Sequence, residues 1–347
     1  MKALVYDGPG SRKWTEVADP VVTDAEDAIV RVDAVTICGT DLHILKGDVP
    51  AVTDGRILGH EAVGTVTEVG SGVKNVKVGD RVLVSCITAC GRCRYCRVGR
   101  YGQCLGGGGW ILGHLIDGTQ AEYVRVPFAD TSTYPVPEGV SDEEVLMLAD
   151  ILPTGYEVGV RNGQVEPGDT VVVVGAGPIG LSVMLGAQLY SPGRIVAVDL
   201  ADQRLEAAER FGADVVINSG SSDVVAEVKA MTDGLGADVA VEAVGIPETF
   251  EQCTRLIRPG GRVANVGVHG APATLHLEDL WIRDVTITTG LVDTYSTPQL
   301  LALISQGRID PKPFITHRFA LDDFMAAYDE FSRPQETGAL KVVLTRT

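Results

Sequence analysis

The sequence is short of positive charge. Lysine and arginine number 29, whereas aspartate and glutamate number 46, which gives a formal net charge of −17 at pH 7. Nucleic acids and anionic membrane surfaces attract basic proteins, so the sequence predicts neither as a partner. A small substrate is not excluded, because the local field of a binding cleft need not follow the net charge.

The sequence also lacks the runs that direct a chain to or through a membrane. Its N-terminus has no basic segment followed by a long apolar run, so no secretory signal is expected. Residues 171–189 carry no charge and have the length of a membrane span. The glycines and Pro178 within this stretch instead favour a buried strand, a tight turn and a buried helix. We therefore expect a cytoplasmic protein.

Internal repeats and low-complexity segments are absent as well. Hydrophobic residues make up 45% of the chain and charged residues 22%, which is the composition of ordinary globular proteins. A chain of 347 residues is long enough for two domains, each with its own core.

The distribution of cysteine is more informative than its abundance. Four of the seven cysteines fall within fifteen residues, and in a reducing compartment such a cluster binds metal more often than it forms disulfides. Four thiolates at this spacing close a tetrahedron around zinc and leave no position for a substrate, so we predict a structural zinc lobe at about residues 86–110. Redox-active cysteines are one alternative; a nucleic-acid zinc knuckle is opposed by the net charge and by the few aromatic residues nearby. The predicted ligands are Cys90, Cys93, Cys96 and Cys104.

A second potential metal site is divided between two segments. Residues 38–43, Cys-Gly-Thr-Asp-Leu-His, combine a thiol, a hydroxyl and an imidazole, and His60-Glu61 begins seventeen residues after this segment ends. Sulfur, imidazole and carboxylate together are ligands that zinc selects, so we predict a catalytic zinc between Cys38, His60 and a later carboxylate. Up to residue 85 the chain shows short β-runs and turns without a long helical period. This pattern predicts a β-barrel-like unit with both segments on turns and strand ends.

The middle of the chain carries the signature of a dinucleotide site. A β-branched run at residues 169–174 precedes Gly175-Ala176-Gly177-Pro178-Ile179-Gly180, and an apolar helical stretch follows. In this context the glycines allow a tight turn, close approach of a pyrophosphate and close packing of the helix, whose N-terminal amides meet the phosphates. The next strand ends in Asp199, whose carboxylate would accept hydrogen bonds from a ribose and repel a 2′-phosphate. The sequence therefore predicts NAD rather than NADP.

Strands and helices alternate through the same region, which is typical of a doubly wound parallel sheet with its ligand at the carboxyl ends of the strands. We predict an α/β protein with a β-rich domain at residues 1–151, a dinucleotide-binding domain at 152–291 and a closing segment at 292–347. The predicted strands are 194–199, 214–217, 237–242, 262–268 and 338–344, and the predicted helices are 202–211, 222–232, 247–257, 297–306 (capped by Thr297) and 321–331.

The order of Cys38, Gly59-His60-Glu61, the cysteine lobe and the glycine turn resembles the zinc-dependent medium-chain alcohol dehydrogenases over nearly the whole chain. The resemblance implies a GroES-like catalytic domain with two zinc ions per chain, a Rossmann domain that binds NAD, and a closing segment that returns to the catalytic domain. Well-known members use a cysteine as the third catalytic ligand, where this sequence has Asp150. We therefore predict Asp150 as that ligand, with Glu61 as the rival carboxylate and an ordinary helix-surface acid as the alternative for Asp150.

The resemblance also implies roles for residues around the zinc and the cofactor. Thr40 would accept the alcohol proton and His43 would carry it onward, although by themselves these residues are typical of a turn and of the surface. Asp41 would orient a ligand. The remaining candidates are Cys86 and Trp110 for the substrate wall; Val266, Val268 and Leu291 for the nicotinamide, or else for plain strand core; Arg204 near the ribose, where it could tolerate phosphate; and Lys341 near the pyrophosphate, or else as a surface lysine.

Together these features predict reversible oxidation of a small or secondary alcohol to a ketone or aldehyde with zinc and NAD. A polyol, threonine or formaldehyde dehydrogenase on the same scaffold is the first alternative, and a non-catalytic NAD-binding redox sensor is a more distant one. The short loop after Cys104 resembles the microbial, tetrameric branch of the family, so we predict a homo-oligomer and a tetramer rather than a dimer.

Overall fold

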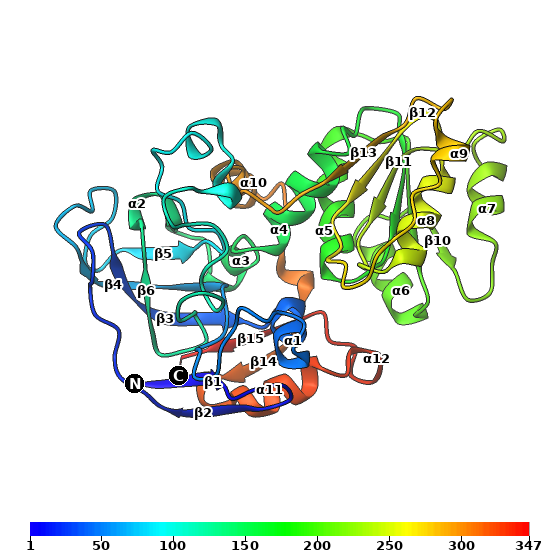
Figure 1. Ribbon diagram of the computed structural model, residues 1–347. Helices are drawn as coiled ribbons and strands as arrows, with labels where there is room; N and C mark the ends of the chain where they lie inside the picture. Colours follow the sequence, from blue (N-terminus) through cyan, green and yellow to red (C-terminus); the bar gives the residue numbers. More distant parts are fainter. Residues whose placement is uncertain (347) are drawn as a thin grey trace. The chain divides into compact units, whose positions relative to one another are not determined.

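The computed structural model describes residues 1–346, which fold as two compact units (Figure 1). Unit 1 contains residues 1–150 together with the residues from Asp293 onward, and unit 2 contains Ile151–Val292. None of the helices in residues 1–346 has the length and the apolar character needed to cross a bilayer.

Unit 1 is built mainly from β-strands. Its larger sheet has the strand order β14-β15-β3-β4-β5-β7, and β6 pairs with β3 beside this path. The long central strand β3 is almost wholly buried, and β15 from the closing segment pairs with it antiparallel through Val343 and Thr36. The C-terminal part of the chain therefore completes a sheet whose other strands lie between residues 28 and 135. The strands are β1 (Lys2–Tyr6), β2 (Arg12–Glu16), β3 (Ala28–Thr36), β4 (Ala62–Val69), β5 (Arg81–Val84), β6 (Tyr123–Val126), β7 (Thr133–Pro135), β14 (Ile315–Ala320) and β15 (Lys341–Thr345).

The helices of unit 1 are short, and one of them was missed in the sequence. Helix α1 (Gly39–Lys46) starts directly after Cys38 and ends at Gly47, whose φ of 87° suits glycine. Cys38 itself lies between the end of β3 and this helix, so the prediction of a turn or strand end is confirmed for Cys38 and wrong for residues 39–43, because eight residues are too few to show a clear helical period. The other helices are α2 (Ala129–Ser132), α3 (Asp142–Leu146), α10 (Thr297–Ser305), α11 (Phe324–Phe331) and α12 (Pro334–Thr337).

Unit 2 is a six-stranded parallel sheet flanked by helices, as the alternation predicts. Its strand order is β10-β9-β8-β11-β12-β13, so the order reverses beside β8. Right-handed crossovers in opposite directions from this point place α5 and α8 on opposite sides of the sheet (Figure 1). Burial on both faces explains the continuous apolar run of β8. The elements are α4 (Ile151–Thr154), a π-helix (Gly155–Arg161), β8 (Thr170–Val174), α5 (Pro178–Ala187), β9 (Arg194–Asp199), α6 (Asp202–Arg210), β10 (Val215–Asn218), α7 (Val224–Ala230), β11 (Ala237–Glu242), α8 (Pro247–Leu256), β12 (Ile257–Asn265), α9 (Leu277–Leu280) and β13 (Thr286–Thr289).

Some predicted boundaries are wrong. Strand β12 begins at Ile257, through a bulge around Pro259-Gly260-Gly261, and ends before Val266. Thr297 is the first residue of α10 and Ser296 holds the N-cap position, so Thr297 is not the cap. The helix predicted to begin at Leu321 starts with a 3-10 turn, and the α-helix follows it.

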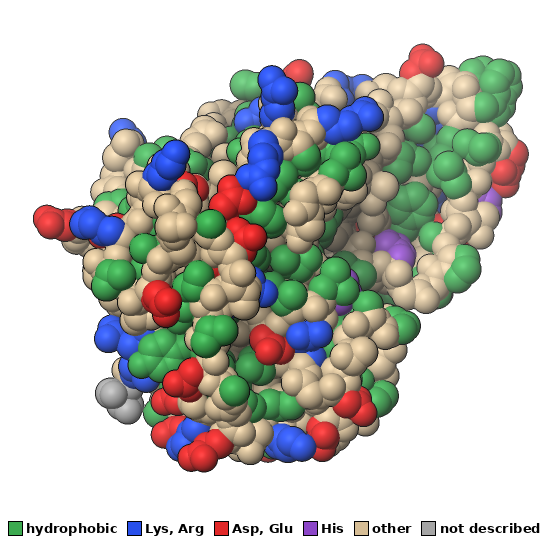
Figure 2. All heavy atoms as spheres, turned by 60° about the vertical axis from the view of Figure 1, so that its left-hand side comes forward, with side chains coloured by type: hydrophobic (Ala, Val, Ile, Leu, Met, Phe, Trp, Pro, Cys, Tyr) green, Lys and Arg blue, Asp and Glu red, His purple; other side chains and the backbone are tan. Residues whose placement is uncertain are grey.

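Acidic and basic side chains are interspersed over the face drawn in Figure 2. Among the described residues on that face, the basic ones do not form a continuous surface.

Candidate metal centres and cofactor-binding turn

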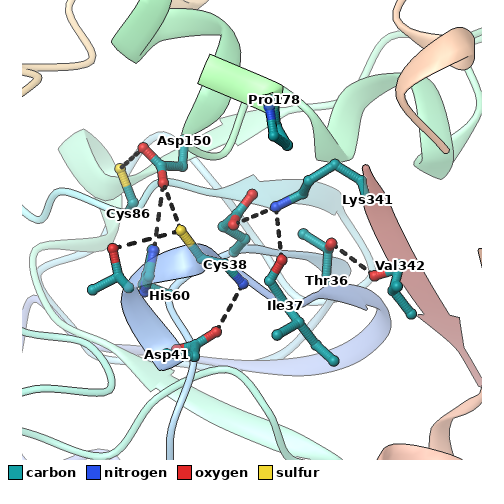
Figure 3. Close-up of polar contacts among 12 residues, drawn as sticks. Thr36, Ile37, Cys38, Asp41, His60, Cys86, Asp150, Pro178, Lys341 and Val342 are labelled. Carbon is teal, nitrogen blue, oxygen red and sulfur yellow. Dashed lines mark hydrogen bonds and ion pairs between the residues drawn. The ribbon is translucent and has the colours of Figure 1, made fainter. Parts of the chain in front are cut away.

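A group of metal-ligand side chains lies within unit 1. One potential ligand atom from each of Cys38, His60, Glu61 and Asp150 lies within 4.8 Å of all the others. Asp150 Oδ2 lies 3.5 Å from Cys38 Sγ and 3.5 Å from His60 Nε2, and Figure 3 shows the three side chains pointing toward one another. The structure thus brings together four residues that are separated by up to 112 positions in the sequence.

The turn that carries Cys38 is held by a buried chain of hydrogen bonds. Asp41 Oδ2 accepts from the backbone N–H of Cys38 (2.9 Å) and from Nε2 of Gln120 (2.9 Å). The Oε1 of Gln120 in turn accepts from the hydroxyl of Tyr328 (2.7 Å). Asp41 therefore fixes the backbone at Cys38, whereas Gln120 and Tyr328 are supporting residues that the sequence did not reveal.

The same glutamine packs against the segment that carries His60. Gly59, just before it, has a φ of 91°, and a Cβ there would lie 2.4 Å from Cγ of Gln120. Only glycine fits this approach. One amide side chain thus supports the segments of both predicted ligands.

Asp150 is not a helix-surface acid. It lies between α3 and α4, and its side chain is 13% exposed. Its Oδ1 lies 3.8 Å from the sulfur of Cys86, which is buried. The apolar residues on either side of Asp150 keep the carboxylate away from solvent, as a ligand site requires.

Lys341 and Glu61 form a buried ion pair beside these ligands. The ammonium donates to Glu61 Oε1 (2.8 Å) and to the backbone carbonyl of Ile37 (3.0 Å), and both side chains are 1% exposed (Figure 3). The alternative that Lys341 is a surface lysine is therefore wrong. Because Ile37 precedes Cys38 and Glu61 follows His60, a single side chain connects the two ligand-bearing segments.

The electrostatics of this group suit a divalent cation. Burial and the neighbouring Asp150 raise the pKa of Cys38, and burial raises the pKa of Glu61. Burial lowers the pKa of His60, but the hydrogen bond that its ring donates to Asp150 outweighs this and raises the pKa well above its usual range. The second oxygen of Glu61 is buried and has no hydrogen-bond partner within residues 1–346. An orphaned carboxylate oxygen beside a thiol, an imidazole and a second carboxylate fits zinc.

The four clustered cysteines converge as predicted from their spacing. One sulfur from each of the four lies within 4.8 Å of the others, and the sulfurs of Cys90 and Cys96 are 3.9 Å apart. A Cβ on Gly106 would lie 2.7 Å from the sulfur of Cys90, so the chain closes tightly over the group. Among the residues that the structure describes, no other His, Cys, Asp or Glu joins this group, which fits a four-thiolate zinc.

Backbone amides point at the sulfurs of this lobe. The sulfur of Cys93 accepts from the N–H groups of Cys96 and Leu105 (both 3.4 Å), and that of Cys104 accepts from Cys90 and Gly106 (both 3.3 Å). These amides lower the pKa of Cys93 to about 6. A lowered pKa favours the thiolate that binds metal, whereas burial raises the pKa of Cys96 in the same group.

The glycine turn of unit 2 has the geometry expected of a phosphate site. Gly175 has a φ of 99°, and a Cβ on Gly180 would lie 1.8 Å from the carbonyl oxygen of Gly175. A Cβ on Gly177 would meet nothing within 4 Å, which leaves open space at the N-cap of α5. Pro178 occupies the first position of that helix, with Ile179 next. An anion can therefore approach the backbone of this turn closely.

Asp199 lies directly beside the turn. Its Oδ2 accepts from the N–H of Ala176 (2.8 Å), and its Oδ1 accepts from the N–H of Ala201 (3.0 Å). Arg204 Nη1 is 3.8 Å from Oδ2. Asp199 is thus both a turn residue and a carboxylate at the position where a ribose is expected.

Comparisons with known proteins agree with this geometry. Family models match residues 24–138 (alcohol dehydrogenase GroES-like domain) and residues 178–306 (zinc-binding dehydrogenase). An alcohol dehydrogenase from Cupriavidus necator is 41% identical over 99% of this chain and 98% of its own length. The chain belongs to the zinc-dependent medium-chain alcohol dehydrogenase family. The predicted fold class, a GroES-like domain with a Rossmann domain, and the predicted oxidoreductase activity are confirmed, which removes the alternative of a non-catalytic redox sensor.

Solved structures of the family match over the whole chain. The zinc-dependent alcohol dehydrogenase 2 from Streptococcus pneumonia, in its apo form, is 50% identical, covers 100% of this chain and 98% of its own, and has a TM-score of 0.96. A dehydrogenase from Escherichia coli CFT073, complexed with NADH, is 29% identical over 99% of both chains, with a TM-score of 0.90. Zinc and a nicotinamide cofactor belong to this family.

The family resemblance assigns Thr40 and His43 to proton transfer and Trp110 to the substrate wall. These residues differ in how close they lie to the predicted zinc ligands. Thr40 Oγ1 is 3.6 Å from Cys38 Sγ. His43 is further out: its side chain is 45% exposed, and its Nδ1 lies 2.9 Å from Asp48 Oδ2. The ring of Trp110 stacks on His114 at 4.2 Å and meets that of His60 edge-on at 6.3 Å.

The residues that family resemblance assigns to the nicotinamide do not lie on strands. Val266 and Val268 follow the end of β12, and Leu291 follows the end of β13. Val268 is 71% exposed and Leu291 is 45% exposed. The alternative that these two residues form plain strand core is therefore wrong, and their exposure leaves them accessible to a ligand of unit 2.

Proposed function

We propose that this dehydrogenase oxidises a small or secondary alcohol reversibly with NAD, using one catalytic and one structural zinc ion per chain. The observation that carries the proposal is the convergence of Cys38, His60 and Asp150 beside an unpartnered oxygen of Glu61. Three protein ligands and an open position are the pattern of catalytic rather than structural zinc. The cysteine lobe, which supplies four thiolates, would hold the second ion.

In this proposal, residues of the protein keep the zinc-binding side chains in position and transfer the proton of the alcohol. Zinc supplies a Lewis acid for the oxygen of the alcohol or carbonyl, and NAD accepts the hydride. Asp41 and Gln120 keep the Cys38 segment in place, which preserves the angle at which its sulfur is presented. The hydroxyl of Thr40, beside that sulfur, takes the proton of the alcohol while it releases its own proton toward His43. His43, at the surface and close to Asp48, passes the proton to solvent.

Metal analysis of the purified protein tests this proposal directly. We expect two zinc ions per chain, together with alcohol-dependent reduction of NAD. A chain that held no zinc after purification without chelators, or that turned over no alcohol, would refute it. A panel of secondary alcohols, primary alcohols, polyols, threonine and formaldehyde then separates the proposed substrate class from the alternatives on this scaffold.

We assign NAD rather than NADP because of the carboxylate of Asp199. The Asp199→Asn variant keeps an oxygen for the N–H of Ala176 but loses the negative charge that would repel a 2′-phosphate. We expect the ratio of kcat/KM for NAD to that for NADP to fall about tenfold or more, the effect of one charged hydrogen bond. The control is Glu206→Gln on the exposed side of α6, which should leave the ratio unchanged. A wild-type preference for NADP would contradict the assignment.

We further propose a cytoplasmic homo-oligomer, with a tetramer favoured over a dimer. Within residues 1–346, strand β13 is an edge strand that pairs only with β12. Exposed apolar side chains lie on and after the neighbouring helix α9: Leu277 (60%), Trp281 (74%) and Ile282 (69%). Unpaired strand edges and apolar patches are covered in stable proteins, most simply by a second copy of the chain.

The double variant Trp281→Glu/Ile282→Glu should therefore lower the molar mass in solution, measured by light scattering after size exclusion. Lys229→Glu, a substitution on the exposed part of α7, serves as the control. A wild-type protein that is a monomer would contradict the proposal.

A further inference from the structure

Glu242, the last residue of β11, buries its carboxylate completely within unit 2. Its Oε1 accepts three hydrogen bonds, from the N–H groups of Val244 (2.9 Å) and Gly245 (2.8 Å) and from the hydroxyl of Thr249 (2.7 Å). A buried carboxylate is costly unless donors surround it, and three donors on one oxygen meet that requirement. The side chain therefore fixes the segment that follows β11, residues 243–246.

The same residue also holds the segment that follows β12. Its backbone carbonyl accepts from the N–H groups of Val266 (2.8 Å) and Gly267 (3.1 Å). Its Oε2 lies 3.4 Å from His269 Nε2 and accepts no hydrogen bond within residues 1–346. A Cβ on Gly267 would lie 2.3 Å from Oε2, so glycine alone allows this approach. Residues 266–269 are thus packed directly against the carboxylate.

Residues 243–246 pack between the glycine turn and residues 266–269. A Cβ on Gly245 would lie 2.4 Å from the carbonyl oxygen of Val268. On the other side, a Cβ on Gly175 would lie 2.7 Å from Cγ2 of Val244. Any shift of residues 243–246 would therefore disturb both the glycine turn and residues 266–269.

These contacts lie at the carboxyl ends of β11 and β12. The glycine turn and Asp199 lie at the carboxyl ends of β8 and β9, in the other half of the sheet. In a doubly wound sheet a dinucleotide spans the point where the strand order reverses, with one nucleotide on each side. The glycine turn and Asp199 serve the adenosine side, so the other side is left for the nicotinamide nucleotide. We infer that Glu242 is the positioning residue for the nicotinamide half of the cofactor, because it fixes both segments at that edge. The inference rests on the proposed use of a nicotinamide cofactor.

Two substitutions separate the acceptor function of Glu242 from its bulk. Glu242→Ala leaves the donors of Val244, Gly245 and Thr249 without their acceptor. Glu242→Gln keeps one oxygen for all three donors and loses only the charge that strengthens those bonds. If positioning through these hydrogen bonds is the role, the glutamine variant should recover most of what the alanine variant loses.

The experiment compares binding of NADH with binding of ADP-ribose, which lacks the nicotinamide, to the full-length protein. Titrations followed by NADH fluorescence and by calorimetry should show NADH bound about tenfold or more weakly by Glu242→Ala and within about threefold of wild type by Glu242→Gln. ADP-ribose should lose at most about threefold in either variant, because Val244 touches the glycine turn but the hydrogen bond from Ala176 of that turn to Asp199 does not involve Glu242. Unequal losses for the two ligands would not arise from general damage to the fold.

A milder variant keeps the inference testable if Glu242→Ala does not fold. Thr249→Val removes one donor without changing the shape of a partly exposed side chain, and it should weaken NADH alone by about threefold. Equal losses for NADH and ADP-ribose, or no loss in either Glu242→Ala or Thr249→Val, would overturn the role of Glu242. A wild-type protein that bound neither ligand would instead overturn the cofactor proposal, and this inference with it.

Discussion

Replacing Asp150 by alanine should remove one of the two proposed zinc ions and lower kcat/KM for alcohol oxidation by about three orders of magnitude or more. The expected loss is large because Cys38 and His60 would be left with one carboxylate, Glu61, which already accepts from Lys341. Two ligands do not hold zinc against dilution, and the substrate oxygen would lose its Lewis acid. Metal content by mass spectrometry and steady-state kinetics measure the two effects on the same preparation.

Two further variants show whether the loss of zinc and activity comes from the missing ligand. Asp150→Cys restores an anionic ligand of the type that well-known relatives use, so it should recover the zinc and much of the activity. Glu143→Ala, on α3 close by in the chain, removes an exposed partner of Arg318 and should change neither quantity. Retention of both zinc ions in Asp150→Ala would transfer the ligand role to Glu61.

Replacing Lys341 by methionine should lower the free energy of unfolding of unit 1 by about 3–5 kcal/mol. The ammonium and the carboxylate of Glu61 are each 1% exposed, so the substitution leaves a buried charge without its partner and Ile37 without a donor. The burial of the side chain opposes its charge, but Glu61 and Cys38 outweigh this and keep the pKa of Lys341 raised. Denaturant unfolding followed by tryptophan fluorescence measures the change, because Trp14 and Trp110 both pack against the core of this unit.

The partner substitution decides whether the ion pair is the cause. Lys341→Met combined with Glu61→Gln removes both charges and should regain most of the lost stability, which a double-mutant cycle would quantify. Lys77→Met is the control, since Lys77 forms an exposed pair with Asp80 and should leave stability unchanged. If the single and double variants of Lys341 were equally destabilised, the effect would come from packing and not from charge.

Sequence reasoning worked where the chemistry is local. The four cysteines lie within fifteen residues, and the glycine turn is one short segment between a strand and a helix, so spacing alone indicates what each motif forms. It worked less well for supports that come from distant parts of the chain. Gln120 bonds to Asp41 across 79 positions and to Tyr328 across 208 positions, and no periodicity connects such residues.

The positions at which strands end were also predicted poorly from the sequence. The run from Arg262 to Val268 resembles one strand because valine and alanine make up most of it, but β12 ends at Asn265 and the following residues pack against Glu242. In the sequence, a glutamate at the end of an apolar strand looks like an ordinary solvent-exposed strand end. Two glycines packed near Glu242, Gly245 and Gly267, distinguish it from an exposed strand end. Their role becomes visible only in the contacts between separate segments of the structure.

The closing strand β15 has a consequence for the order of events during synthesis. Unit 1 needs residues on both sides of unit 2 in the sequence, whereas unit 2 is continuous. On the ribosome, unit 2 can therefore fold while β3 still lacks its neighbour β15 and Glu61 still lacks Lys341. Until the last strand is made, the segments that carry Cys38 and His60 have Gln120 but lack Tyr328 and Lys341, so the proposed catalytic metal is expected to be loaded late, after translation has passed residue 341.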